Sequence, residues 1–298
     1  MSPHWAGVFA ALTTPFEGNG DVSLTGLRHN IDLYNRFPLA GYVVLGSTGE
    51  SVFLSDAESE SLAAAAVEAA APGRKVIAGT ARESARLTLE LTNRLASLGI
   101  EAALVRTPSF YKSRMTGEAL KDYFLAVADG SRVPILIYNI PQNTGISLDS
   151  SLVIELSRHP NIAGIKDSSG NLTAVGEVVP SVGEDFSFLL GTGSLVLPAL
   201  LMGAGGAILA AADAAPELCC RLHALFLEGR FKEARKVQGD LASLHQAVVS
   251  RQGIPGLKFA LDLLGYRGGP VRRPLLPPTD EGRREIRNVL KTIGIIRP

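Results

Sequence analysis

Several features that mark particular classes of protein are scarce in this 298-residue sequence. Its only cysteines, Cys219 and Cys220, stand side by side in a predicted helix, so they do not form the disulfide framework of a small secreted protein. No apolar run reaches the roughly 18 residues that a membrane helix needs. The apolar stretch 5–12 has no basic segment before it, which argues against a signal peptide. We therefore expect a soluble, cytoplasmic protein without a membrane partner, or an organellar one if a targeting peptide has been removed.

Neither the charge distribution nor the histidine and cysteine spacing indicates a nucleic-acid or metal partner. Lysine plus arginine balance aspartate plus glutamate at 29 each, and no long basic run is present, so no nucleic-acid partner is expected. No H-E-x-x-H or paired-cysteine motif exists, and the glycine-rich segments 191–193 and 203–206 do not complete a dinucleotide fingerprint. We expect neither metal nor cofactor. The histidines without metal-site spacing are His4, His29, His159, His223 and His245.

A recurring unit is present instead: a short run of small and β-branched residues, a polar turn, and then a helical stretch. Such alternation predicts a parallel sheet with right-handed crossovers, and eight units favour a closed (β/α)₈ TIM barrel. The predicted strands are Gly7–Leu12, Tyr42–Leu45, Val76–Gly79, Ala102–Val105, Ile135–Tyr138, Ile162–Ile165, Phe186–Leu190 and Gly206–Leu209.

The helices between the strands leave their own signals. Leu87, Leu91, Leu95 and Leu98 share one helical face, and Gly99 stands where a C-terminal cap belongs. The alanine-rich stretch 60–71 predicts another helix, which stops at the following Pro-Gly pair.

The pattern changes after residue 214. Helices without intervening strands are predicted over 217–227, 231–249 and 255–264, and another after residue 279. We expect a barrel over 1–214 that carries the active site, with residues 215–298 as a helical extension packed on it.

Catalytic groups of such a barrel lie at the carboxyl ends of its strands. Lys166 ends the sixth predicted strand, where loss of water would favour a neutral amine able to attack a ketone. A lysine that merely reaches solvent, or pairs with Asp167, fits the spacing at least as well.

Three other strand ends carry suggestive groups. Gly46–Glu50 could present hydroxyls and backbone N–H groups to a carboxylate, or could be an ordinary turn that caps the next helix. Tyr138 could transfer a proton, or could be a core aromatic. The aromatic loop Thr107–Tyr111 either covers the site or enters a subunit interface.

Taken together, Gly46–Glu50, Tyr138–Pro141 and Gly164–Asp167 resemble the dihydrodipicolinate synthase / N-acetylneuraminate lyase family, from about residue 6 onward. That resemblance implies a TIM barrel, usually a tetramer of two tight dimers, and a Schiff base between lysine and pyruvate.

The same resemblance assigns roles to particular residues. It makes Lys166 the imine former and Tyr138 the proton carrier, with Thr48 and a neighbouring subunit's Tyr111 completing the relay. It also places the predicted substrate contacts at Ser47, Thr48, Asn143, Ser168, Gly191 and Ile208.

One position separates members of the family. The synthases carry an arginine for the aldehyde's carboxylate where Asn143 stands here, and a neutral amide cannot replace a bidentate guanidinium. Segments such as His159–Ile162 and Gly253–Lys258 instead resemble 4-hydroxy-2-oxoglutarate aldolases of the mitochondrial type. Thr48 and Asn139 depart from that pattern.

We therefore expect cleavage of 4-hydroxy-2-oxoglutarate to pyruvate and glyoxylate. The alternatives are 4-hydroxy-tetrahydrodipicolinate synthase, an aldolase or dehydratase for 2-keto-3-deoxy sugar acids, and a non-enzymatic 2-oxo acid sensor.

Overall fold

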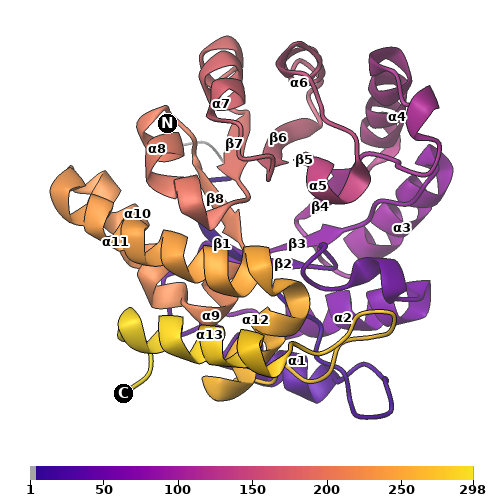
Figure 1. Cartoon of the computed structure of the whole chain (residues 1–298). Coiled ribbons are helices and arrows are strands. Elements are labelled where there is room, and N and C mark those ends of the chain that lie inside the picture. Colours follow the sequence, from indigo (N-terminus) through magenta and orange to yellow (C-terminus); the bar gives the residue numbers. More distant parts are fainter. Residues whose placement is uncertain (1–4, 298) are drawn as a thin grey trace.

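A computed structural model of the chain describes residues 5–297, and its strands close into one barrel (Figure 1). Each strand pairs in parallel with the next along the chain, and β8 closes the barrel against β1. Every predicted strand is confirmed, with ends shifted by at most two residues. The strands are β1 Gly7–Ala11, β2 Gly41–Val44, β3 Lys75–Gly79, β4 Ala102–Arg106, β5 Ile135–Asn139, β6 Ile162–Asp167, β7 Ser187–Leu190 and β8 Gly206–Leu209.

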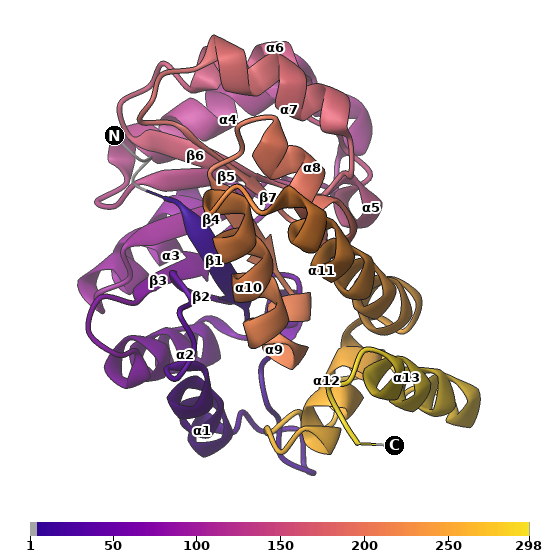
Figure 2. The same cartoon turned by 90° about the vertical axis from the view of Figure 1, so that its left-hand side faces the viewer.

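Helices surround the barrel and continue beyond it (Figures 1 and 2). Within residues 5–297, none of them is long and apolar enough to cross a membrane. The helices are α1 Leu24–Tyr34, α2 Asp56–Ala69, α3 Ala85–Ser97, α4 Gly117–Gly130, α5 Pro141–Thr144, α6 Ser150–Leu156, α7 Leu172–Val178, α8 Val196–Leu201, α9 Ala211–Ala214, α10 Pro216–Leu227, α11 Phe231–Leu244, α12 Gly253–Leu263 and α13 Asp280–Thr292. Short 3₁₀ turns cover Ser51–Phe53, Lys112–Arg114, Val179–Ser181 and Gly193–Leu195.

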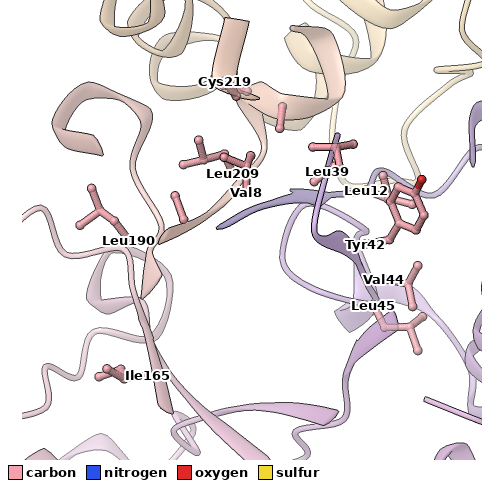
Figure 3. Close-up of a cluster of buried hydrophobic side chains, with 14 of the residues drawn as sticks. Val8, Leu12, Leu39, Tyr42, Val44, Leu45, Ile165, Leu190, Leu209 and Cys219 are labelled. Carbon is pink, nitrogen blue, oxygen red and sulfur yellow. The ribbon is translucent and has the colours of Figure 1, made fainter. Parts of the chain in front are cut away.

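Successive side chains along each strand point to opposite faces, and they form two separate apolar layers. Side chains such as Phe9, Leu104 and Leu189 fill the barrel interior, while their neighbours along the strands point outward to the helices. Figure 3 shows part of the outer layer, including Val44 of β2 and Ile165 of β6. Because Ile165 faces outward, the next residue of β6, Lys166, faces the interior.

The C-terminal helices lie beside the barrel (Figure 2). Helix α10 packs on β1 and α11, and α12 packs on both α9 and α13. The helix predicted over 231–249 stops at Leu244, and the chain continues as a wider π-helical segment, His245–Arg251. The division of the chain at residue 214 stays a prediction.

Two expectations about helices were wrong in detail. Helix α2 begins at Asp56, four residues before the expected start, because Ser55 caps it and Glu58 bonds back to the Ser55 amide. Along α3, Leu91 and Leu95 are fully buried as predicted, whereas Leu87 is 52% exposed and Leu98, which caps the helix, is 37% exposed. Thr88 and Thr92 complete the buried face, and the Thr92 hydroxyl oxygen lies 2.8 Å from that of Thr80, so apolar spacing alone identified only part of that face.

Candidate active site

A cavity of about 860 Å³ opens at the carboxyl ends of the strands. A smaller cavity of about 270 Å³ adjoins it and shares Ser47, Tyr138 and Asn143. The structure therefore brings together most of the residues that the sequence predicted for the site. Those lining the larger cavity are Ser47, Thr48, Tyr138, Asn143, Lys166, Ser168 and Gly191.

Lys166 and Tyr138 form the centre of this cavity. They are register partners on β6 and β5, and they are 3% and 5% exposed. The Lys166 Nζ lies 4.3 Å from the centroid of the Tyr138 ring. Asp167 does not serve as the partner of the lysine, since its carboxylate accepts from Asn139 Nδ2 at 2.7 Å and from the Ser169 amide at 2.8 Å. The lysine therefore remains available to a ligand in the cavity.

The turn after β2 brings hydroxyls to the same place. The Ser47 hydroxyl donates to the Tyr138 hydroxyl across 3.4 Å, and Thr48 lines the cavity beside it. The turn is strained, because Leu45 and Glu50 both adopt left-handed conformations, with φ of 58° and 55°. It is held in place partly by the Thr14 hydroxyl, which donates to the Gly49 carbonyl at 2.7 Å.

A buried ion pair anchors the end of that turn. Glu50 Oε1 lies 2.6 Å from Lys258 Nζ, and both side chains are almost fully buried. Lys258 Nζ also donates to the Pro270 carbonyl at 2.7 Å, and the Arg272 amide donates to Glu50 Oε2 at 2.9 Å. Burial lowers the pKa of Lys258, while the Glu50 carboxylate opposes that change. Sequence reasoning missed this pair because its partners are 208 residues apart, although each lies in a segment that the family resemblance had singled out.

Further polar residues line the cavity at the ends of β6 and β7. Gly191 lies against Ser168 so closely that a Cβ on this glycine would be 1.9 Å from the Ser168 hydroxyl oxygen. Thr192 and His245 follow on the same wall. From the sequence, His245 was noted only as lacking the spacing of a metal ligand. Its position on the cavity wall was not predicted.

Asn143 lies on the short helix α5 and lines both cavities. Its neighbour Gln142 donates to the Ser168 carbonyl at 3.1 Å, which joins α5 to the end of β6. Among the described residues that line the larger cavity, Arg251 is the only arginine. It pairs with Glu285 of α13, and nothing in its sequence context had singled it out.

Two of the predicted site residues lie elsewhere. Tyr111 is 70% exposed, packs edge-on against the exposed Phe110, and lines neither cavity. Its loop is held by the Glu83 carboxylate, which accepts from the Phe110 amide at 2.9 Å. Ile208 is fully buried in the interior core beside Phe9, and Ala210, two residues later, lines the cavity in its place.

A buried carboxyl group completes the electrostatics around the lysine. Asp213 of α9 is completely buried and accepts from the Thr13 amide at 2.9 Å. Burial raises the pKa of Asp213 well above its usual range, and the nearby Lys166 charge partly opposes that rise. No cluster of three or more histidine, cysteine, aspartate or glutamate side chains in residues 5–297 is arranged to hold a metal.

An inward-facing lysine at the mouth of a TIM barrel, beside a tyrosine and a hydroxyl-bearing turn, defines a class I aldolase, which works through a lysine Schiff base. Residues 4–293 match the Dihydrodipicolinate synthetase family, and the chain belongs to that family. Its members are Schiff-base lyases, so this chain is an enzyme of the class I aldolase type.

Known relatives align with this chain over nearly their full length. The chain is 35% identical to the 4-hydroxy-tetrahydrodipicolinate synthase of Methanothrix thermoacetophila over 285 residues, which is 95% of each protein. It matches the crystal structure of dihydrodipicolinate synthase from Aquifex aeolicus with a TM-score of 0.91 and 33% identity, covering 97% of this chain and 98% of that one.

A third relative was solved with a ligand. It is the dihydrodipicolinate synthase from Acinetobacter baumannii complexed with pyruvate, which matches with a TM-score of 0.93 and 28% identity over 98% of this chain and 99% of that one. These relatives carry the name of the synthase, so the resemblance to 4-hydroxy-2-oxoglutarate aldolase, expected as the nearer one, is not confirmed by them.

Proposed function

We propose that Lys166 forms a Schiff base with the C2 carbonyl of pyruvate and that the enzyme makes or breaks the adjacent carbon–carbon bond. One observation carries the proposal: the buried Lys166 amine lies 4.3 Å from the Tyr138 ring, on a cavity wall that also carries Ser47 and Thr48. The pyruvate complex of the Acinetobacter baumannii relative supports pyruvate as the first substrate.

The chemistry follows from those groups. The Lys166 nitrogen adds to C2 of pyruvate, and loss of water gives a protonated imine that acts as an electron sink. Removal of a C3 proton yields an enamine, whose C3 forms a bond to the aldehyde carbon. The aldehyde oxygen takes up a proton as the C4 hydroxyl forms, and water then releases the 4-hydroxy-2-oxo acid from Lys166. Cleavage follows the same steps in reverse.

Tyr138 is the proposed proton carrier for these steps. Its hydroxyl can exchange a proton with the substrate because the Ser47 hydroxyl already lies within hydrogen-bonding reach at 3.4 Å. In the proposal, Ser47 and Thr48 also donate to the pyruvyl carboxylate, and Thr48 continues the relay toward Tyr111 of a neighbouring subunit. The exposure of Tyr111 and Phe110 supports a homotetramer in which another copy covers this loop.

We propose glyoxylate as the aldehyde, so that the cleavage substrate is 4-hydroxy-2-oxoglutarate. The neutral Asn143 supports this choice, because it offers no guanidinium to the distal carboxylate of a longer aldehyde. The names of the relatives favour the second candidate, condensation of pyruvate with aspartate 4-semialdehyde, as in 4-hydroxy-tetrahydrodipicolinate synthase. A cytoplasmic location remains part of the proposal.

A direct comparison of substrates tests this function. Pyruvate release from 4-hydroxy-2-oxoglutarate is followed with lactate dehydrogenase, and pyruvate consumption is followed with aspartate 4-semialdehyde and with 2-keto-3-deoxy sugar acid precursors. We expect the highest kcat/KM for 4-hydroxy-2-oxoglutarate and no turnover by Lys166→Ala. Rapid turnover of aspartate 4-semialdehyde alone would instead establish the synthase, and turnover by Lys166→Ala would remove the lysine from the mechanism.

A further inference from the structure

His245 is a partly buried histidine on the wall of the Lys166 cavity that the proposed aldol chemistry does not use. It begins the π-helical segment after α11, a kind of helical irregularity that is frequent at functional sites. Its ring lies against the loop that follows β7. Gly193 of that loop lies close to the ring, since a Cβ there would lie 3.1 Å from the His245 Cβ and 3.3 Å from its Nδ1.

The two ring nitrogens have different partners, and those partners determine where the proton lies. The Gly193 amide points to Nδ1 at 3.4 Å, and an amide N–H can only donate, so Nδ1 accepts. Burial lowers the pKa of His245 to about 4, so the ring is neutral near pH 7 and carries its single proton on Nε2. Nε2 therefore donates to the Thr192 hydroxyl oxygen, 3.1 Å away.

This arrangement leaves the Thr192 hydroxyl with one proton to donate elsewhere. Thr192 lines the same cavity as Lys166, and it follows Gly191, which lies against Ser168. The loop cannot turn away freely, because Gln238 donates to the Gly193 carbonyl at 2.8 Å and accepts from the Leu197 amide at 2.7 Å. A fixed hydroxyl donor on a cavity wall selects an acceptor, and a carboxylate is the strongest acceptor that a substrate of this enzyme offers.

We propose that Thr192, oriented by His245, binds the carboxylate of the aldehyde-derived half of the substrate. Thr192 is a specificity-determining residue in this proposal, and His245 is a positioning residue that acts through it. Ser168 and Arg251 line the same cavity, and the Arg251 guanidinium is paired with Glu285 of α13. The inference rests on the proposed function, since it presumes that Lys166 holds the 2-oxo acid end of the substrate.

The probe for this subsite is 2-oxoglutarate, which can form the Lys166 imine and carries a second carboxylate at C5 but cannot be cleaved. The comparison compound is 2-oxobutyrate, which forms the same imine without the second carboxylate. Half-maximal concentrations for trapping each compound with borohydride are measured by intact mass. For Thr192→Val we expect the value for 2-oxoglutarate to rise about tenfold and that for 2-oxobutyrate to change less than about twofold.

Matched variants separate a binding role from a structural one. Thr192→Ser, which keeps the hydroxyl, should restore most of the affinity for 2-oxoglutarate, and Thr173→Val on the exposed face of α7 should change nothing. His245→Ala should weaken 2-oxoglutarate alone, and His245→Gln, which keeps an N–H donor, should partly rescue it. Because both residues act on one group, Thr192→Val combined with His245→Ala should lose little more than either change alone.

The possible failures are distinguishable. If neither compound is trapped on Lys166 in the unaltered enzyme, the proposed function itself is wrong. If both are trapped and Thr192→Val leaves their ratio unchanged, or weakens both equally, then Thr192 does not read the second carboxylate and this inference is overturned. The inference is equally overturned if the unaltered enzyme shows no preference for 2-oxoglutarate over 2-oxobutyrate.

Discussion

The amine nitrogen of Lys166 lies 4.3 Å above the centre of the Tyr138 ring, and the two residues are paired in register on adjacent strands. The register of the two strands fixes the backbone positions from which the proposed nucleophile and the proposed proton carrier project into the cavity. A slip of one residue would turn both side chains to the outer face of the barrel.

Replacing Tyr138 with phenylalanine should separate the two roles of this pair. The variant keeps the ring beside Lys166 but lacks the hydroxyl, so pyruvate should still be trapped on Lys166 by borohydride. The aldol step should slow by about 10²–10⁴-fold, the usual contribution of a positioned proton donor or acceptor. Single-turnover kinetics measures each step. Equal, small losses in both steps would show that the hydroxyl carries no proton.

Asn143→Arg should change the choice of aldehyde. The new guanidinium would reach the larger cavity, where Arg251 is the one arginine among the described lining residues, and it could bind a distal carboxylate through two hydrogen bonds. We expect kcat/KM for aspartate 4-semialdehyde to rise by about tenfold or more relative to that for glyoxylate. Asn143→Gln serves as the control of similar size. An unchanged ratio in Asn143→Arg would mean that this position does not contact the second substrate.

Breaking the buried Glu50–Lys258 pair should damage stability and activity together. Lys258→Met would leave the Glu50 carboxylate buried without its cation, which typically costs about 3–5 kcal/mol of unfolding free energy. Because Glu50 ends the turn that carries Ser47 and Thr48, activity should fall as well. Adding Glu50→Gln should recover part of the loss, and urea unfolding measures both variants. A stability loss in Lys258→Met below about 1 kcal/mol would contradict the anchoring role.

The pKa of His245 predicts a pH dependence of stability. Burial lowers this pKa to about 4, against about 6.5 in the unfolded chain, so the unfolded chain binds the extra proton first as the pH falls. The native state should therefore lose up to about 3 kcal/mol relative to the unfolded state between pH 6.5 and pH 4.

His245→Gln should lack this component. Urea unfolding of both proteins is measured at about pH 7 and about pH 4.5. Between these two pH values, the unfolding free energy should fall less in His245→Gln than in the unaltered protein. Parallel losses in the two proteins would show that His245 titrates normally in the folded chain.

The sequence predicts the barrel well for a physical reason. Each strand is buried on both faces and is therefore a short apolar run, which can be recognised even where its ends are uncertain. For β8 the predicted ends are also correct. The buried face of α3 was harder to predict. Thr88 and Thr92 are buried there with satisfied hydroxyls, a situation that depends on tertiary partners such as Tyr123 and Thr80.

The site divides in a similar way. Lys166, Tyr138 and Ser47 follow strand ends, and the barrel necessarily brings strand ends together, so their proximity was predictable. His245 lines the cavity and Lys258 pairs with Glu50 from the C-terminal helical segment, whose packing no local pattern specifies. The family resemblance had singled out the segment that contains Lys258, but not the contacts of Lys258 and not the position of His245.

The most direct test of the account is the identity of the residue that binds pyruvate. The enzyme is incubated with pyruvate, reduced with borohydride, digested, and mapped by peptide mass, with Lys166→Ala treated in parallel. We predict one adduct, on Lys166, and none in the variant. An adduct on another lysine, such as Lys258, or no adduct while the enzyme remains active, would contradict it.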